Sequence, residues 1–287
     1  MLLREFTPHP ALREFIQCYR ICHFDFGANS PVPIKLYAPK PESVLHFFIH
    51  DYWAILKPGS KRQTYSSMVF FGQRTTIMHQ FTGPNFLNAH IVFQPSAVFR
   101  LTGISASEFT NQHLDPELIF ASGVKQVLAR LQDASEYQEM VTVLEQFCFR
   151  LVKRSRHAQM PFDVVSRHMI PQGGLLSLQQ LANSACYSTK QFTRKFLQRV
   201  GVNPKLYARI IRFNRAYNLK NAFPDRDWLS IVVECGYHDY QHMSKDYVEF
   251  TGLSPEAFDI AEALSPERKL GLTSNLYQQR IACYGPS

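Results

Sequence analysis

The chain has no acidic residue between Asp163 and Asp225, although 23 of its 287 residues are aspartate or glutamate. A solvated helical face normally carries charges of both signs, so a long run of one sign favours contact with a polyanion such as nucleic acid. An ordinary basic surface is the alternative explanation. The net charge of +8 is compatible with either. Ten basic residues lie in this acid-free segment: Arg167, Lys190, Arg194, Lys195, Arg199, Lys205, Arg209, Arg212, Arg215 and Lys220.

The sequence also lacks the motifs that mark common enzyme classes. It contains no GxSxG motif, no P-loop and no dinucleotide-binding glycine pattern. Its histidines form no HxH pair, which disfavours a metal site built from His46, His50, His79 and His90. We therefore expect neither a cofactor nor catalytic residues. A ligand pocket inside a small barrel stays open, because it would leave no residue signature.

Cysteine pairs and long apolar runs are missing as well. The six cysteines include no CxxC pair, which favours reduced thiols in a cytosolic protein. The opening residues have no signal-peptide apolar core, and no apolar run approaches the length of a transmembrane helix. These features predict a cytoplasmic protein without membrane contacts.

Residues 1–155 have the sequence pattern of a β-rich domain that ends in helices. Short apolar segments, separated by Pro, Gly, Asp and Asn, predict strands of about five residues in an antiparallel sandwich or small barrel. Residues 12–23 fit either a short helix or a first strand. Beyond residue 98 the pattern becomes helical, and the apolar stripe of the last helix could pack on its own domain or form a dimer seam. The expected strands are 44–49, 53–56, 68–71, 75–79 and 89–93, and the expected helices are 99–101, 124–131 and 136–153.

The most informative feature is an internal repeat in the second half. Residues 178–207 align without a gap on residues 229–258, an offset of 51 positions. Phe192 falls on Met243, and the Gly-Val-Asn-Pro sequence at 201–204 falls on Gly-Leu-Ser-Pro at 252–255. Two similar supersecondary units are therefore expected at a fixed spacing.

Each unit has the pattern of two helices joined by a tight turn. In the first unit, Ser188 can cap a helix over 189–200, which Gly201 ends. In the second unit, Asp239 can cap a helix over 240–251. The outer face of the first of these helices is cationic. A helix-turn-helix places such a second helix in the major groove of DNA.

A long helix over 205–221 joins the two units. A rigid connection fixes their separation, and successive major grooves on one face of DNA lie about 34 Å apart. The predicted fold is thus a two-domain chain. An α+β domain (1–155) precedes an all-α domain (156–265) with two helix-turn-helix units, and a carboxy-terminal tail (266–287) follows.

These residues carry a family resemblance. The second unit, through residues 231–239, 242–247 and 251–255, resembles the double helix-turn-helix domain of AraC/XylS-type transcriptional regulators. More weakly, 93–96, 101–104 and 115–118 resemble a sensor-like amino-terminal domain from one branch of that family. The resemblance implies a sequence-specific regulator that binds double-stranded DNA. It leaves open a small-molecule effector and a homodimer.

The resemblance also implies positions for DNA contacts. Residues on the outer face of the first half of each recognition helix would reach base edges, where Arg194 suits guanine and Gln241 suits adenine. Phosphate contact or mere exposure is the alternative for each. The base-contact candidates are Lys190, Thr193, Arg194, Gln241, His242 and Lys245, and the phosphate candidates are Lys195, Arg199 and Arg209.

The second recognition helix departs from the family pattern because it contains Asp246 and Glu249. We therefore expect the first unit to supply more of the affinity. An alternative function is a DNA-binding module fused to an enzymatic domain of the alkyl-transfer or cupin-like type. Alkyl transfer needs a cysteine in a Pro-Cys-His-Arg setting, and no cysteine of this chain has that setting. A non-specific architectural protein is a third class, against which the two capped helical units argue.

Overall fold

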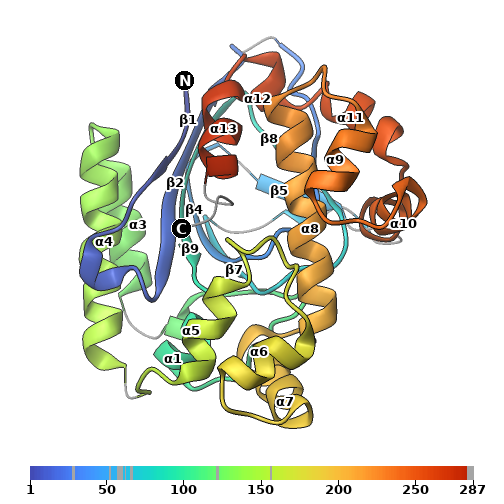
Figure 1. The fold of residues 1–287 in the computed structure, drawn as a ribbon. Helices are drawn as coiled ribbons and strands as arrows, with labels where there is room; N and C mark the ends of the chain where they lie inside the picture. The colour runs from blue at the N-terminus through green and yellow to red at the C-terminus, as the bar shows by residue number, and fades with distance from the viewer. Residues whose placement is uncertain are drawn as a thin grey trace.

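The chain folds into a β-rich amino-terminal half and a helical carboxy-terminal half, which lie side by side (Figure 1). This computed structural model describes residues 1–27, 30–51, 53–56, 61, 63–64, 67–120, 123–155 and 157–282. Cys283 and the rest of the terminus lie outside these residues. The predicted fold class, α+β followed by all-α with two helix-turn-helix units, is confirmed.

Two antiparallel sheets form the amino-terminal domain. In the first sheet, Tyr19 of strand β2 pairs with Phe6 of the edge strand on one side and with Ile91 on the other. The first sheet has the order β1 (Leu2–Phe6), β2 (Ile16–Asp25), β9 (Asn85–Phe93), β4 (Ser43–His50), β7 (Met68–Phe71) and β10 (His113–Leu114). The second sheet has the order β3 (Lys35–Tyr37), β8 (Met78–Thr82), β5 (Trp53–Leu56) and β6 (Gln63–Thr64).

The sheets pack face to face, and among the described residues no strand pairing joins them into a closed barrel. Phe24 and Phe86 of the first sheet share a core with Trp53 and Met78 of the second. Of the two predicted architectures, the structure therefore shows the sandwich rather than the barrel. The strand predicted at 75–79 is shifted, because β8 begins only at Met78.

Helices cover the other face of the first sheet. The apolar stripe of α4 is buried together with residues of β2, β4 and β9 in one core. Own-domain packing of the stripe, one of the two predicted roles, is therefore what the structure shows. The amino-terminal helical elements are η1 (Pro10–Leu12), α1 (Ala97–Thr102), η2 (Ala106–Glu108), α2 (Glu117–Phe120), α3 (Val124–Asp133) and α4 (Tyr137–Arg154).

The carboxy-terminal half is helical throughout its described residues. Helices α6–α7 and α9–α10 are the two helix-turn-helix units, and α8 joins them as predicted. The segment expected as a tail contains two further helices, α12 and α13. The helices are α5 (Pro161–His168), α6 (Leu178–Ser184), α7 (Thr189–Val200), α8 (Pro204–Ala222), α9 (Trp228–Glu234), α10 (Tyr240–Thr251), α11 (Pro255–Glu262), α12 (Pro266–Lys269) and α13 (Ser274–Ala282).

Local chemistry sets the ends of the recognition helices. The Ser188 hydroxyl accepts a hydrogen bond from the Gln191 amide, and the Asp239 carboxylate accepts one from the His242 amide. These caps satisfy amides that have no partner within the first helical turn. Gly201 ends α7 with φ of 96°, a left-handed conformation that glycine adopts without strain.

Buried polar contacts join the two domains at both ends of the helical half. Near the first unit, the Thr110 hydroxyl donates to the Gly201 carbonyl at 2.6 Å. Near the second unit, Lys35 Nζ lies 2.5 Å from carboxylate oxygens of both Glu262 and Glu267. The amino-terminal domain therefore contacts the first unit at the end of α7, and it contacts α11 and α12, which follow the second unit.

Candidate functional site

The recognition helix α7 exposes the side chains that the sequence assigns to DNA. Lys190 and Arg194 are exposed and Thr193 is half-buried. Phe192 and Phe196, on the opposite face, are fully buried among the helices of the first unit. The three base-contact candidates thus lie on the outer surface of α7.

The second recognition helix, α10, has the same arrangement. Gln241 and Lys245 are exposed, and His242 is half-buried against the Tyr237 ring, with ring centroids 5.3 Å apart. Met243 and Tyr247 fill the core of the second unit. The two helices therefore present equivalent outer faces.

The acidic residues of α10 do not weaken its outer face in the way that the sequence suggests. Asp246 is 1% exposed, and its carboxylate accepts a hydrogen bond from Arg209 Nε at 2.9 Å. Glu249 accepts one from Arg209 Nη1 at 3.0 Å. Both acidic side chains are therefore paired with Arg209, and that of Asp246 is also buried. The prediction that the first unit supplies more of the affinity stays a prediction.

The phosphate candidates have three different environments. Lys195 is half-buried with its ammonium 5.3 Å from the centre of the Tyr187 ring. Arg209 is half-buried and would have to leave two carboxylates to bind a phosphate. Arg199 is 8% exposed, and its Nη1 lies 2.7 Å from Asp163 Oδ1. This burial argues against the phosphate contact predicted for Arg199.

The acid-free segment therefore presents less unpaired positive charge in the folded chain than its sequence suggests. Acidic residues from outside it neutralise Arg199, Arg209 and Arg215. Among the described residues, no carboxylate lies within 4.0 Å of Lys190, Arg194, Lys195 or Lys205. Arg212, Lys220 and Lys245, near the second unit, likewise have no such neighbour among the described residues, so cations without a carboxylate partner flank both units.

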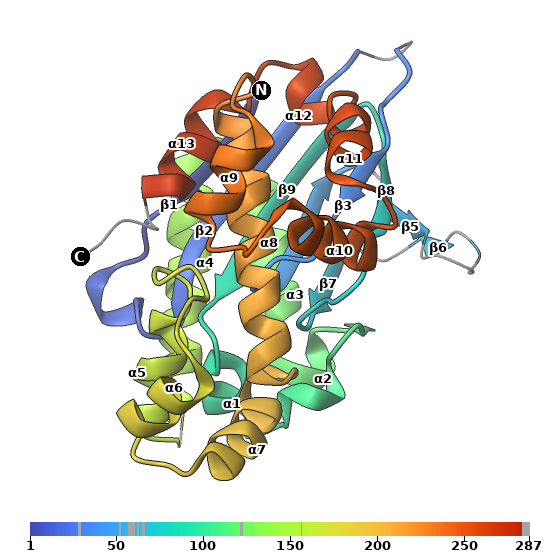
Figure 2. The same ribbon diagram turned by 45° about the vertical axis from the view of Figure 1, so that its right-hand side comes forward.

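Helix α8 sets the distance between the units. It has 19 residues, and at 1.5 Å per residue it is about 28 Å long. Its residues enter both cores, with Ile211 in the first and Phe213 in the second. Figure 2 shows α7 at the lower end of α8 and α10 beside the middle of α8.

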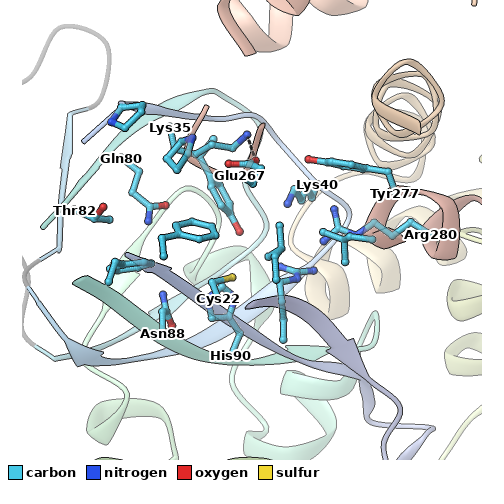
Figure 3. A pocket seen from close by; sticks show the side chains of 18 residues that line it. Cys22, Lys35, Lys40, Gln80, Thr82, Asn88, His90, Glu267, Tyr277 and Arg280 are labelled. Atoms are coloured by element: carbon cyan, nitrogen blue, oxygen red, sulfur yellow. Dashed lines mark ion pairs between the residues drawn. The ribbon is translucent and has the colours of Figure 1, made fainter. Parts of the chain in front are cut away.

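A second candidate site is a cavity of about 60 Å³ between the domains (Figure 3). Strands β2, β3 and β9 line it from the amino-terminal side, and α12 and α13 line it from the carboxy-terminal side. Cys22, Phe24, Phe86 and Leu276 provide apolar walls. The sequence did not reveal this cavity, because residues as far apart in the chain as Leu3 and Arg280 line it.

Ion pairs account for most of the charge around the cavity. Arg20 and Arg280 each lie 2.7 Å from Glu5 Oε1, and Lys35 is held by two glutamates. Lys40 is the lining cation that has no such pair among the described residues. Burial and the nearby Arg280 charge lower the pKa of Lys40 to about 7.

Several neutral polar groups also face this region without a partner. Both ring nitrogens of His90 and the Tyr37 hydroxyl are buried and make no hydrogen bond with the residues that the structure describes. Burial keeps the pKa of His90 well below its usual value, so its ring is neutral. A buried polar atom without a partner is costly, and a ligand with acceptor groups would relieve that cost.

The histidines and cysteines form no metal-binding group in the described part of the chain. His46 and His90 lie close, with ring centroids 4.2 Å apart, but no group of three metal-binding side chains forms there. Burial raises the pKa of Cys22 and of Cys148 to about 12, which disfavours the reactive thiolate. No described helix is long and apolar enough to span a membrane.

Two family models match parts of the chain. Residues 181–259 match the family described as "Helix-turn-helix domain", and residues 4–115 match "Domain of unknown function (DUF6597)". The first match confirms the resemblance predicted for the repeat. No curated protein sequence matches the chain.

Several solved structures are similar to this chain at low identity. ToxT from Vibrio cholerae is 9% identical with a TM-score of 0.48, over 85% of this chain and 98% of that one. ToxT from strain SCE256, bound to an unsaturated fatty acid, is 10% identical with a TM-score of 0.43, over 90% and 95%. The AraC-like transcriptional activator CuxR is 10% identical with a TM-score of 0.26, over 76% and 80%. Likeness this distant carries no information about ligands or DNA sites.

Proposed function

We propose that this chain, whose residues 181–259 form an AraC-type helix-turn-helix domain, is a sequence-specific DNA-binding regulator of transcription. One observation carries the proposal. Two capped recognition helices present polar or cationic residues at equivalent positions, Lys190 and Arg194 on α7 and Gln241 and Lys245 on α10. In this proposal each helix enters a major groove, and successive major grooves on one face of DNA lie about 34 Å apart.

The residues of each helix have separate roles in this proposal. Arg194 has a guanidinium that can donate two hydrogen bonds to a guanine edge, and Gln241 has an amide that matches an adenine edge. Lys190, Thr193, His242 and Lys245 supply further contacts in the same two grooves. Lys195 binds a phosphate beside the first groove.

A small ligand in the interdomain cavity controls the DNA-binding half in this proposal. Lys40 offers a charge without a carboxylate partner, and Tyr37 and His90 offer unpaired polar atoms beside apolar walls. This combination suits a ligand with an anionic group on an apolar body. Tyr277 and Arg280 of α13 also line the cavity, so a ligand bound there would contact the helical half directly. A cytoplasmic location and a homodimer remain predictions.

An enzymatic amino-terminal domain is the competing function. Alkyl transfer would require an accessible thiolate, whereas Cys18, Cys22, Cys148 and Cys235 are all buried. Cys186 is exposed but lies at the turn of the first helix-turn-helix unit. No described residue therefore favours that alternative over regulation.

Selection of bound duplexes from a random pool tests the proposal. Fluorescence anisotropy then compares the selected duplex with a scrambled one over a salt titration. We expect a large preference for the selected duplex, and a loss of about 1–3 kcal/mol of that preference in Arg194→Ala and in Gln241→Ala. Lys125→Ala, which removes a surface charge on α3, is the control and should bind normally. Equal binding of both duplexes would contradict the proposal.

A further inference from the structure

The two recognition helices share an apolar feature that DNA binding by charge does not explain. Leu197 on α7 is 45% exposed, and Val248 on α10 is 51% exposed. They occupy the same position in the repeat, 51 residues apart. Both helices therefore carry a water-exposed aliphatic side chain at the same place.

These side chains lie on the DNA-facing surface. Lys190, Arg194 and Leu197 have the spacing i, i+4, i+7, which puts three residues on one face of a helix. Gln241, Lys245 and Val248 repeat that spacing on α10. The apolar side chain thus follows the candidate base contacts along each helix, one turn further from the amino-terminal cap.

Neither side chain is needed for packing within its unit. The cores are filled by the neighbouring residues Phe196 and Tyr247, which are 0% and 1% exposed, and neither Leu197 nor Val248 belongs to a core. The amino-terminal domain reaches the next residue of α7, where the Ser105 hydroxyl donates to the Gln198 carbonyl at 3.2 Å. Leu197 nevertheless keeps nearly half of its surface open.

We propose that Leu197 and Val248 contact the C5-methyl groups of thymines, so that each half of the DNA site is read partly through an apolar contact. The thymine methyl is the one apolar group on the base edges of the major groove. The surrounding cations draw DNA to this face, which makes a major groove a better occupant than an apolar protein surface. This inference rests on the proposed function and adds a base preference to it.

The spacing of residues along each recognition helix also predicts where these thymines lie relative to the other contacted bases. Residues 194 and 197 are three positions apart, which is about 4.5 Å along a helix axis. Base pairs stack every 3.4 Å or so. The thymine that Leu197 contacts therefore lies one or two base pairs from the base that Arg194 contacts, and the same holds for Val248 and Lys245.

Deoxyuridine tests the contact because it is thymidine without the methyl group. Each thymine of the selected duplex is replaced in turn, and binding of the full chain is measured by anisotropy. Burial of one methyl group contributes about 0.8 kcal/mol, so we expect about fourfold weaker binding at one thymine in each half-site. In Leu197→Ala, substitution at the first of these thymines should have no further effect. In Val248→Ala the second thymine should become insensitive.

Leu229→Ala is the matched control, because Leu229 is 66% exposed on α9, outside the recognition helices. It should keep both deoxyuridine effects. Circular dichroism checks that each variant keeps its helical content. We expect no loss, because a substitution to alanine at an exposed position removes little packing. Two outcomes would overturn the methyl contacts but not the proposed function. One is specific DNA binding that no deoxyuridine substitution weakens. The other is a loss of affinity on deoxyuridine substitution that stays the same in Leu197→Ala and Val248→Ala. Absence of any specific binding would overturn the proposed function as well.

Discussion

The buried pair of Arg199 and Asp163 distinguishes the role that the sequence predicts for Arg199 from the role that the structure gives it. Asp163 is 0% exposed, and Arg199 is 8% exposed with its guanidinium 4.6 Å from the centre of the Phe99 ring. Asp163 also accepts a hydrogen bond from the Met160 amide at 2.8 Å, at the start of α5. The pair therefore ties the start of the helical half to the end of α7.

Replacing Arg199 by methionine leaves the Asp163 carboxylate buried without its partner. Breaking a buried pair on one side costs about 3–5 kcal/mol, and we expect a loss of that size in Arg199→Met. Urea unfolding, followed by circular dichroism, measures it. In the double variant Asp163→Asn/Arg199→Met, much of the loss should be recovered, because no unpaired charge remains.

The salt dependence of DNA binding provides the decisive comparison. Each phosphate contact contributes about 0.9 to the slope of log affinity against log salt concentration. Lys195→Met should lower the slope by about that amount, whereas Arg199→Met should leave it unchanged at a temperature where the variant is folded. A stable Arg199→Met variant with a reduced slope would refute the structural role and restore the phosphate contact.

Three further predictions concern the units, the domain contacts and the cavity. Arg194→Ala should weaken binding to the selected duplex more than Lys245→Ala at fixed salt, because a guanidinium can donate two fixed hydrogen bonds to one guanine whereas an ammonium acts as a point charge; a gel-shift series showing the reverse would contradict this. Burial alone would raise the pKa of Glu5, but Arg280 and Arg20 lower it to about 2. The stability from this carboxylate is therefore complete above about pH 4.5 and is lost as the pH falls towards 2, and thermal unfolding across this range should be flatter in Glu5→Gln. Lys40 carries its charge only below about pH 7, so stabilisation by aliphatic or aromatic monocarboxylates in a thermal-shift assay should decline as the pH rises through 7, and Lys40→Met should abolish it. A pH-independent response would argue against a role for Lys40.

The helix-turn-helix units could be predicted in detail because their determinants are local. Ser188, Asp239 and Gly201 set helix ends through contacts within a few residues, and the sequence predicted the bounds of α7 and α10 as the structure shows them. The repeat also located their cores, since equivalent apolar residues recur at a constant offset.

Contacts between distant residues could not be predicted in the same way. Asp163 lies 36 residues before Arg199, and Asp246 lies 37 residues after Arg209. The charges near each arginine in the sequence therefore do not predict either ion pair. The cavity forms where Lys40 lies near residues of α12 and α13. The sequence predicted these residues only as part of a carboxy-terminal tail. A short-strand pattern likewise fits a sandwich or a barrel, because closure depends on pairing between sheets rather than on the strands themselves.

The central claim is that α7 and α10 read two successive major grooves. Methylation interference on the selected duplex measures this directly, because dimethyl sulfate modifies guanine N7 in the major groove. The proposed function predicts two clusters of interfering positions about 10 base pairs apart on one face of the DNA. A single cluster, or two clusters on opposite faces, would contradict it.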